Sequence, residues 1–118
     1  MRMFKPENEE EWHEFRRQHL TSTELRDLHL SRTARKWQEL REQKETGKRW
    51  GGNQFTEWGT AREPILAPLV TDVDSRLGYN ADPQTIIINP DDDRLCGTPD
   101  LFSEDGEVIG EIKTCLLY

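Results

Sequence analysis

Apolar positions in the first part of the chain recur every three or four residues, the spacing of one helical face. Trp12, Phe15 and His19 predict a first helix over residues 9–19. The sequence TSTE at 21–24 has the form of a capping box, in which the first Thr caps the helix and the Glu reaches back, and it predicts the start of a second helix. The first quarter of the chain is therefore expected to be helical.

A third helix is expected from a cap at Ser31, with Trp37 and Leu40 toward the core and Gly47 at its end. A fourth helix is expected over 56–70, kinked or split by its internal proline at position 64. The residues predicted to form the buried stripe of this fourth helix are Trp58, Ala61, Ile65 and Leu69.

The second half of the chain changes to a strand pattern. We expect a loop over 71–82, a strand over 85–89 and a hairpin formed by residues 94–102 and 107–116. Helices followed by a small, mainly antiparallel sheet define an α+β fold.

The hairpin has an unusual distribution of charge. The sequence DG at 105–106 is typical of a two-residue type I′ turn, because Gly tolerates positive φ, and this register places Asp100 opposite Glu111. Opposite Cβ atoms lie about 5 Å apart, so the two carboxylates repel each other. A divalent cation between them would reverse the sign of that interaction. Lys113 falls on the same face, two residues beyond Glu111.

The composition limits the number of domains and the cellular location. The chain has 118 residues, of which 33% are apolar and 33% charged, and no apolar run approaches the roughly 20 residues of a membrane span. We expect one domain without membrane contact or signal peptide, with Cys96 and Cys115 as reduced thiols in the cytoplasm.

The net charge of −7 is unevenly distributed. Residues 1–50 hold 12 Lys and Arg against 10 Asp and Glu, whereas residues 51–118 hold 4 against 13. A basic-leaning first half could contact phosphates while an acidic second half gathers cations. Two ordinary solvated surfaces would give the same distribution.

Four sequence blocks together resemble one nuclease family. The PD at 99–100 and the EIK at 111–113 resemble the paired motifs of the PD-(D/E)XK nucleases. The sequence WGTAREP at 58–64 looks like the helix that supplies an additional acidic residue, here Glu63. The sequence WHxxR at 12–16, followed by TSTE, looks like the N-terminal signature of the phage lambda exonuclease or YqaJ-type viral recombinase family.

This resemblance implies a site for two Mg²⁺ ions, with Mn²⁺ as a substitute. Its ligands would be Asp100, Glu111, Glu63 and the main-chain carbonyl of Ile112, since hard oxygen ligands suit these ions. Lys113 would orient or help deprotonate the attacking water and offset charge in the transition state. Without the family blocks, charges at 111 and 113 would simply indicate an exposed edge strand.

The acidic run at 91–93 offers an outer metal ligand by resemblance, and Asp91 has a near-matching spacing. A polar turn is the alternative for this run. Arg16 and Thr23 fall where family members contact the 5′ phosphate of a duplex end, and an Arg fork and a hydroxyl at a helix N-terminus are good phosphate donors. The alternatives are a surface arginine and a threonine that only assists capping.

The resemblance implies a Mg²⁺-dependent DNA nuclease, specifically a 5′→3′ exonuclease on double-stranded ends in phage-type recombination, working in the bacterial cytoplasm with a phage single-strand annealing protein. The alternative is a non-hydrolysing DNA-end-binding or interfering protein of the same fold. Family members continue with a helix, a further strand and more helices, which this sequence lacks. We therefore expect residues 1–118 to form a single nuclease-like domain with an incomplete PD-(D/E)XK core, which self-associates through the exposed apolar residues 116–118.

Overall fold

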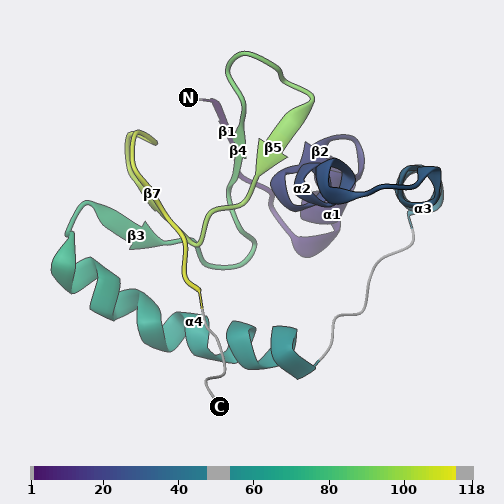
Figure 1. The fold of residues 1–118 in the computed structure, drawn as a ribbon. Helices are drawn as coiled ribbons and strands as arrows, with labels where there is room; N and C mark the ends of the chain where they lie inside the picture. Colours follow the sequence, from purple (N-terminus) through teal and green to yellow (C-terminus); the bar gives the residue numbers. More distant parts are fainter. Residues whose placement is uncertain (1, 48–53, 114–118) are drawn as a thin grey trace. The chain divides into compact units, whose positions relative to one another are not determined.

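The computed structural model describes residues 2–47 and 54–113, and their contacts divide them into two compact units (Figure 1). One unit, here called the helical unit, contains residues 2–47 and 82–98. The other, the hairpin unit, contains residues 54–81 and 99–113. The expected association through residues 116–118 lies outside the described residues.

The helical unit contains three helices, and the first two confirm the predictions. Helix α1 spans Glu9–Arg17 and helix α2 spans Ser22–Leu30. The predicted capping box is present, because Thr21 Oγ1 accepts a hydrogen bond from Glu24 N at 3.3 Å and Glu24 Oε1 accepts one from Thr21 N at 2.9 Å. The start of α2 is therefore fixed by its own sequence.

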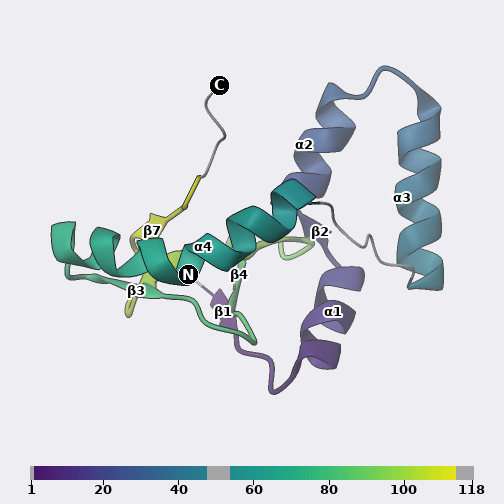
Figure 2. The ribbon, with the colours of Figure 1, turned by 90° about the horizontal axis from the view of Figure 1, so that it is seen from below.

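Helix α3, Ala34–Thr46, differs from the prediction at its start and in its buried face. Its N-cap is Thr33, whereas the predicted cap, Ser31, is the C-cap of α2. Gly47 ends α3 as predicted, with a left-handed φ of 74°. Trp37 is 58% exposed and not in the core, since α3 lies alongside α2 with no fully buried residue of its own (Figure 2).

A four-stranded sheet supports these helices, in the order β1-β4-β5-β2. Its strands are β1 (Arg2–Phe4), β2 (Leu20–Thr21), β4 (Ile86–Ile88) and β5 (Leu95–Gly97). Strand β2 pairs in parallel with β5, which puts Thr21 beside Cys96 and starts α2 directly from the sheet. The prediction contained the strand at 85–89 but missed β1 and β2, which are too short to show an alternating pattern.

The hairpin unit packs one helix on a three-stranded antiparallel sheet of order β3-β6-β7 (Figure 1). Its elements are α4 (Gln54–Val73), β3 (Leu77–Tyr79), β6 (Leu101–Ser103) and β7 (Ile109–Gly110). The core comprises Ala67, Leu77 and Leu101, with Val70, Val108 and Ile112 packed against it. No helix in the described residues is both long enough and apolar enough to cross a membrane.

Two predicted segments of this half were wrong. The expected strand over 94–102 is two strands, β5 and β6, which belong to different sheets and are separated by the segment 98–100. Pro99 in this segment has no N–H group for a ladder hydrogen bond, which favours an interruption there. The expected loop over 71–82 contains the end of α4 and all of β3.

The predicted buried stripe of α4 was also wrong. Ile65 and Leu69 are 69% and 60% exposed, and Ala61 is exposed, whereas Ala67 is buried in the core. Two positions along a helix correspond to a rotation of about 200°, so the packed face is nearly opposite the predicted one. The helix is not split at Pro64, and the side chain of Trp58 lies outside the described residues.

The hairpin turn is longer than the predicted two-residue type I′ turn. Only Gly106 within it has positive φ, 76°, and no non-glycine residue in the described parts of the chain does, so Asp105 does not fit type I′. Ser103 O accepts from Gly106 N at 2.9 Å, and Asp105 Oδ1 accepts from Ser103 Oγ at 2.6 Å and from Glu107 N at 3.0 Å. The loop therefore has four residues, 104–107, closed by side-chain hydrogen bonds.

Candidate functional site

The register of the hairpin places the two predicted carboxylates together. Leu101 pairs with Gly110 across β6 and β7, so the next opposing positions are Asp100 and Glu111. This is the register expected from the sequence, because two-residue and four-residue loops centred on the same bond pair the same residues. The motif residues directly precede β6 and directly follow β7.

Asp100 is the buried member of the pair, 7% exposed, and its Oδ2 accepts a hydrogen bond from Ile112 N at 2.7 Å. Burial raises the pKa of Asp100, and the neighbouring Glu111 raises it further, against the opposing effects of the Ile112 N–H and of Lys113. Lys113 Nζ lies 3.0 Å from Glu111 Oε1. The structure thus brings Asp100, Glu111 and Lys113 into one cluster, as expected.

Asn80 fixes the main chain beside this cluster and was missed by the sequence analysis. Its side chain, 2% exposed, donates from Nδ2 to Pro99 O at 2.9 Å, and its main-chain N donates to Asp100 O at 2.8 Å. A buried amide that bridges two strands orients the turn that presents Asp100. The sequence offers no signal for this role, because Asn is a common residue in turns and loops that have no such contact.

The donor set for a metal ion is only partly assembled. In residues 2–47 and 54–113, no three His, Cys, Asp or Glu side chains form a group able to hold a metal ion. Asp100 and Glu111 supply two carboxylates whose repulsion a cation would relieve, which fits the chemistry of Mg²⁺. Glu63, half-buried on α4, does not complete a three-acid group with them. A site for one cation fits this pair, whereas the implied set for two ions is not brought together.

The acidic run at 91–93 belongs to the helical unit. Asp92 Oδ2 lies 2.8 Å from Arg94 Nη2, and hydrogen bonds from Arg94 lower the pKa of Asp92 to about 2. The main-chain N of Asp91 donates to Asn89 Oδ1 at 2.8 Å. These local contacts are those of a polar turn, the alternative considered for this run.

We expect Asp100→Asn to stabilise the folded chain in the absence of divalent cations. It removes a like-charge pair, which costs roughly 0.2–1 kcal/mol when the charges are directly opposite, and keeps an oxygen acceptor for Ile112 N. The unfolding midpoint should rise by about 1–5 °C. Thermal unfolding followed by circular dichroism in the presence of a chelator measures this change.

The pH dependence provides a control for this explanation. The pKa of Asp100 is higher in the folded chain than in the unfolded chain, so the folded state binds this proton more tightly. As the pH rises from the ordinary pKa of an aspartate to the raised pKa of folded Asp100, the free energy of unfolding of the wild-type chain should therefore fall relative to that of Asp100→Asn. A constant difference between the two proteins across this range would contradict the account.

A groove in the helical unit contains the other two predicted site residues. Arg16 on α1 and Thr23 in the first turn of α2 both line it, together with residues of α3. The further basic residues that line this groove are Arg17, Arg26, Lys36 and Lys44.

Arg16 is a half-buried cation that stacks on an aromatic ring. Its guanidinium lies over the Trp12 ring, 4.3 Å from Cζ to the ring centroid, and it forms no ion pair with any described residue. Its Nε is buried, and no residue in the described parts of the chain accepts a hydrogen bond from it. Burial lowers the pKa of Arg16, against the opposing effects of Cys96 and Glu24. A desolvated and unpaired guanidinium favours an anion as its partner.

Thr23 is exposed on the groove, in the first turn of α2. The capping box uses the N–H groups of Thr21 and Glu24, and the first turn of a helix has further N–H groups without an acceptor inside the helix. These N–H groups, the Thr23 hydroxyl and the helix dipole together favour a phosphate oxygen.

The chain has an α+β fold, and its carboxylate pair with a lysine on an antiparallel hairpin is the arrangement expected for the PD-(D/E)XK class of nucleases. The family model of the YqaJ-like viral recombinase domain matches residues 11–117. The chain therefore belongs to the YqaJ-like viral recombinase family, a nuclease family of phage recombination whose members act on DNA. No curated protein and no solved structure matches the chain.

Proposed function

We propose that this chain is a divalent-cation-dependent deoxyribonuclease that degrades double-stranded DNA from 5′-phosphorylated ends. The observation that carries the proposal is the position of Asp100 opposite Glu111, one step beyond the last pair of the β6–β7 ladder, with Lys113 held on Glu111 at 3.0 Å. A purely structural hairpin has no need of a repulsive pair whose buried member has a raised pKa. Family membership supports the same function.

Asp100 and Glu111 would hold the cation, Mg²⁺ or Mn²⁺, with the main-chain carbonyl of Ile112 and the Glu63 carboxylate as candidate further donors. When bound, the cation supplies charge neutralisation at the phosphate and a lowered pKa of water. The Ile112 N–H keeps the Asp100 carboxylate oriented, at 2.7 Å. The Lys113 side chain is 83% exposed and long enough to position the attacking water and offset transition-state charge.

Arg16 and Thr23 would bind the terminal 5′ phosphate in the groove of the helical unit. A phosphate held there selects a free duplex end and sets a 5′→3′ direction of digestion. The strand left exposed is the substrate for a phage single-strand annealing protein, the partner that we propose inside the bacterial cell.

A second candidate is a DNA-end-binding protein of the same fold that does not hydrolyse DNA. The observation in its favour is the incomplete acidic cluster, since no third acidic residue in the described segments joins Asp100 and Glu111. Both candidates use the groove that contains Arg16 and differ only in turnover.

Incubation with linear and covalently closed circular duplexes in Mg²⁺ distinguishes the nuclease from the end-binding protein. We expect progressive shortening of linear 5′-phosphorylated duplex, no cutting of the circle, and no reaction when the cation is chelated. Binding to linear duplex without shortening would favour the end-binding protein and contradict the nuclease.

A further inference from the structure

Lys44 connects the end of α1 with the start of α2 in the groove to which we assign the terminal phosphate. It lies in the last turn of α3, and its side chain is 24% exposed. Its Nζ donates to the main-chain oxygen of Arg16 at 2.7 Å and lies 2.8 Å from Glu24 Oε1. One ammonium group therefore contacts both the C-terminal turn of α1 and the capping-box glutamate of α2.

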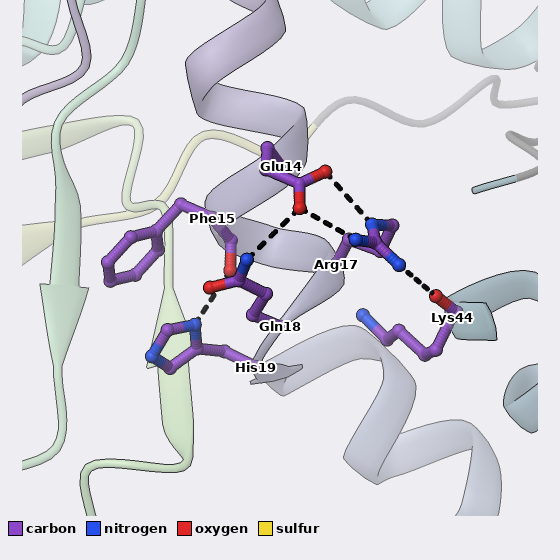
Figure 3. Close-up of polar contacts among 6 residues, drawn as sticks. All are labelled: Glu14, Phe15, Arg17, Gln18, His19 and Lys44. Atoms are coloured by element: carbon purple, nitrogen blue, oxygen red, sulfur yellow. Dashed lines mark hydrogen bonds and ion pairs between the residues drawn. The ribbon is translucent and has the colours of Figure 1, made fainter. Parts of the chain in front are cut away.

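A second contact runs in the opposite direction between the same helices. Arg17 Nη1 donates to the main-chain oxygen of Lys44 at 2.8 Å, and the guanidinium is itself held by Glu14 at 2.9 and 2.7 Å (Figure 3). The ends of α1 and α3 are thus joined by two reciprocal side-chain to main-chain hydrogen bonds. Such an arrangement resists relative movement of the two helices more than either bond alone.

Glu24 shows why the charge of Lys44 matters. Its Oε1 accepts from Thr21 N at 2.9 Å in the capping box, and its carboxylate lies close enough to Arg16 to raise the pKa of that guanidinium. An unpaired Glu24 would repel a phosphate at the start of α2. Lys44, within 2.8 Å, offsets this charge and leaves the capping box intact.

We propose that Lys44 is a positioning residue for the terminal phosphate of DNA. It holds the helix that carries Arg16 at a fixed spacing from the N-terminus of α2 and neutralises Glu24 between them. This inference rests on the proposed function, since it concerns the phosphate that Arg16 and Thr23 would bind. Lys44 need not contact the phosphate itself.

The test compares the affinity for 5′-phosphorylated and 5′-hydroxyl duplexes, measured by fluorescence anisotropy in a chelator, so that no turnover is required. We expect Lys44→Met to reduce the preference of the wild-type chain for the phosphorylated end by about tenfold, with unchanged affinity for the hydroxyl end. Lys44→Arg, which keeps the charge and the donors, should restore most of the preference. Arg41→Met is the matched control, because Arg41 is on the same helix, is 82% exposed and pairs with Glu45 on the helix surface.

The outcomes distinguish the positioning role of Lys44 from the assignment of the phosphate to Arg16. A wild-type preference that survives in Lys44→Met, with unchanged helix content, overturns the positioning role and leaves the proposed function intact. A wild-type chain without any preference overturns the assignment of the phosphate to Arg16 and the positioning role with it. If Lys44→Met does not fold, Lys44→Gln, whose shorter neutral side chain keeps a hydrogen-bond donor, gives the same comparison with the same expected loss.

Discussion

Replacing either Asp100 or Glu111 with alanine should reduce hydrolysis of linear duplex DNA by at least about 10³-fold, the scale for loss of a group that stabilises transition-state charge. Each substitution leaves one carboxylate opposite a methyl group, so the repulsive pair that favours a cation no longer exists. The measurement is the rate of release of acid-soluble nucleotides in Mg²⁺.

Two variants of the same hairpin serve as controls for this loss. Glu107→Ala removes an exposed carboxylate from the turn and should leave the rate unchanged. The hydrogen bond from Glu107 to Asp105 comes from the main-chain N–H, which alanine keeps. Lys113→Met should abolish turnover but keep cation binding, because it removes the ammonium and neither carboxylate. Activity that persists in Asp100→Ala would mean that the hairpin does not contain the reaction centre.

Replacing Arg16 with methionine should remove most of the preference for 5′-phosphorylated ends. A charge-assisted hydrogen bond contributes about 1.5–3 kcal/mol, which corresponds to a loss of about 10- to 150-fold in discrimination. Methionine keeps an apolar contact with the Trp12 ring, so the packing of α1 is preserved. Competition between phosphorylated and hydroxyl duplexes measures the ratio directly.

Arg26→Met is the matched control for this prediction. Arg26 lines the same groove, but it is exposed and its guanidinium is paired with Asp27 at 2.9 Å. Its loss should weaken binding to both kinds of end equally and leave their ratio unchanged. Equal loss of discrimination in both variants would show that the groove acts through its total charge and that Arg16 has no specific role.

The features that could be predicted from the sequence are those decided by neighbouring residues. The capping box at 21–24 needs only its own four residues, and it is present as predicted. The pairing of Asp100 with Glu111 was also predictable, because the register depends on the centre of the turn and not on its length. The predicted turn type was wrong, because hydrogen bonds from Ser103 and Glu107 to the Asp105 side chain close a longer loop without changing its centre.

The features that could not be predicted depend on contacts between distant segments. The buried face of α4 follows from its packing on Leu77 and Leu101, and the helix sequence alone favoured nearly the opposite face. The role of Asn80 depends on the main chain at Pro99, 19 positions away. Lys44 contacts Arg16 across 28 positions, and nothing in the sequence around it distinguishes it from any other surface lysine.

The central claim is that Asp100 and Glu111 form a cation site, and calorimetric titration with Mn²⁺ tests it most directly. The account predicts a binding event in the wild-type chain that is lost in Asp100→Asn, even though that variant is expected to be the more stable of the two without metal. It also predicts that binding persists in Lys113→Met. Equal Mn²⁺ affinity in the wild-type chain and in Asp100→Asn would contradict the assignment of the cation to this pair.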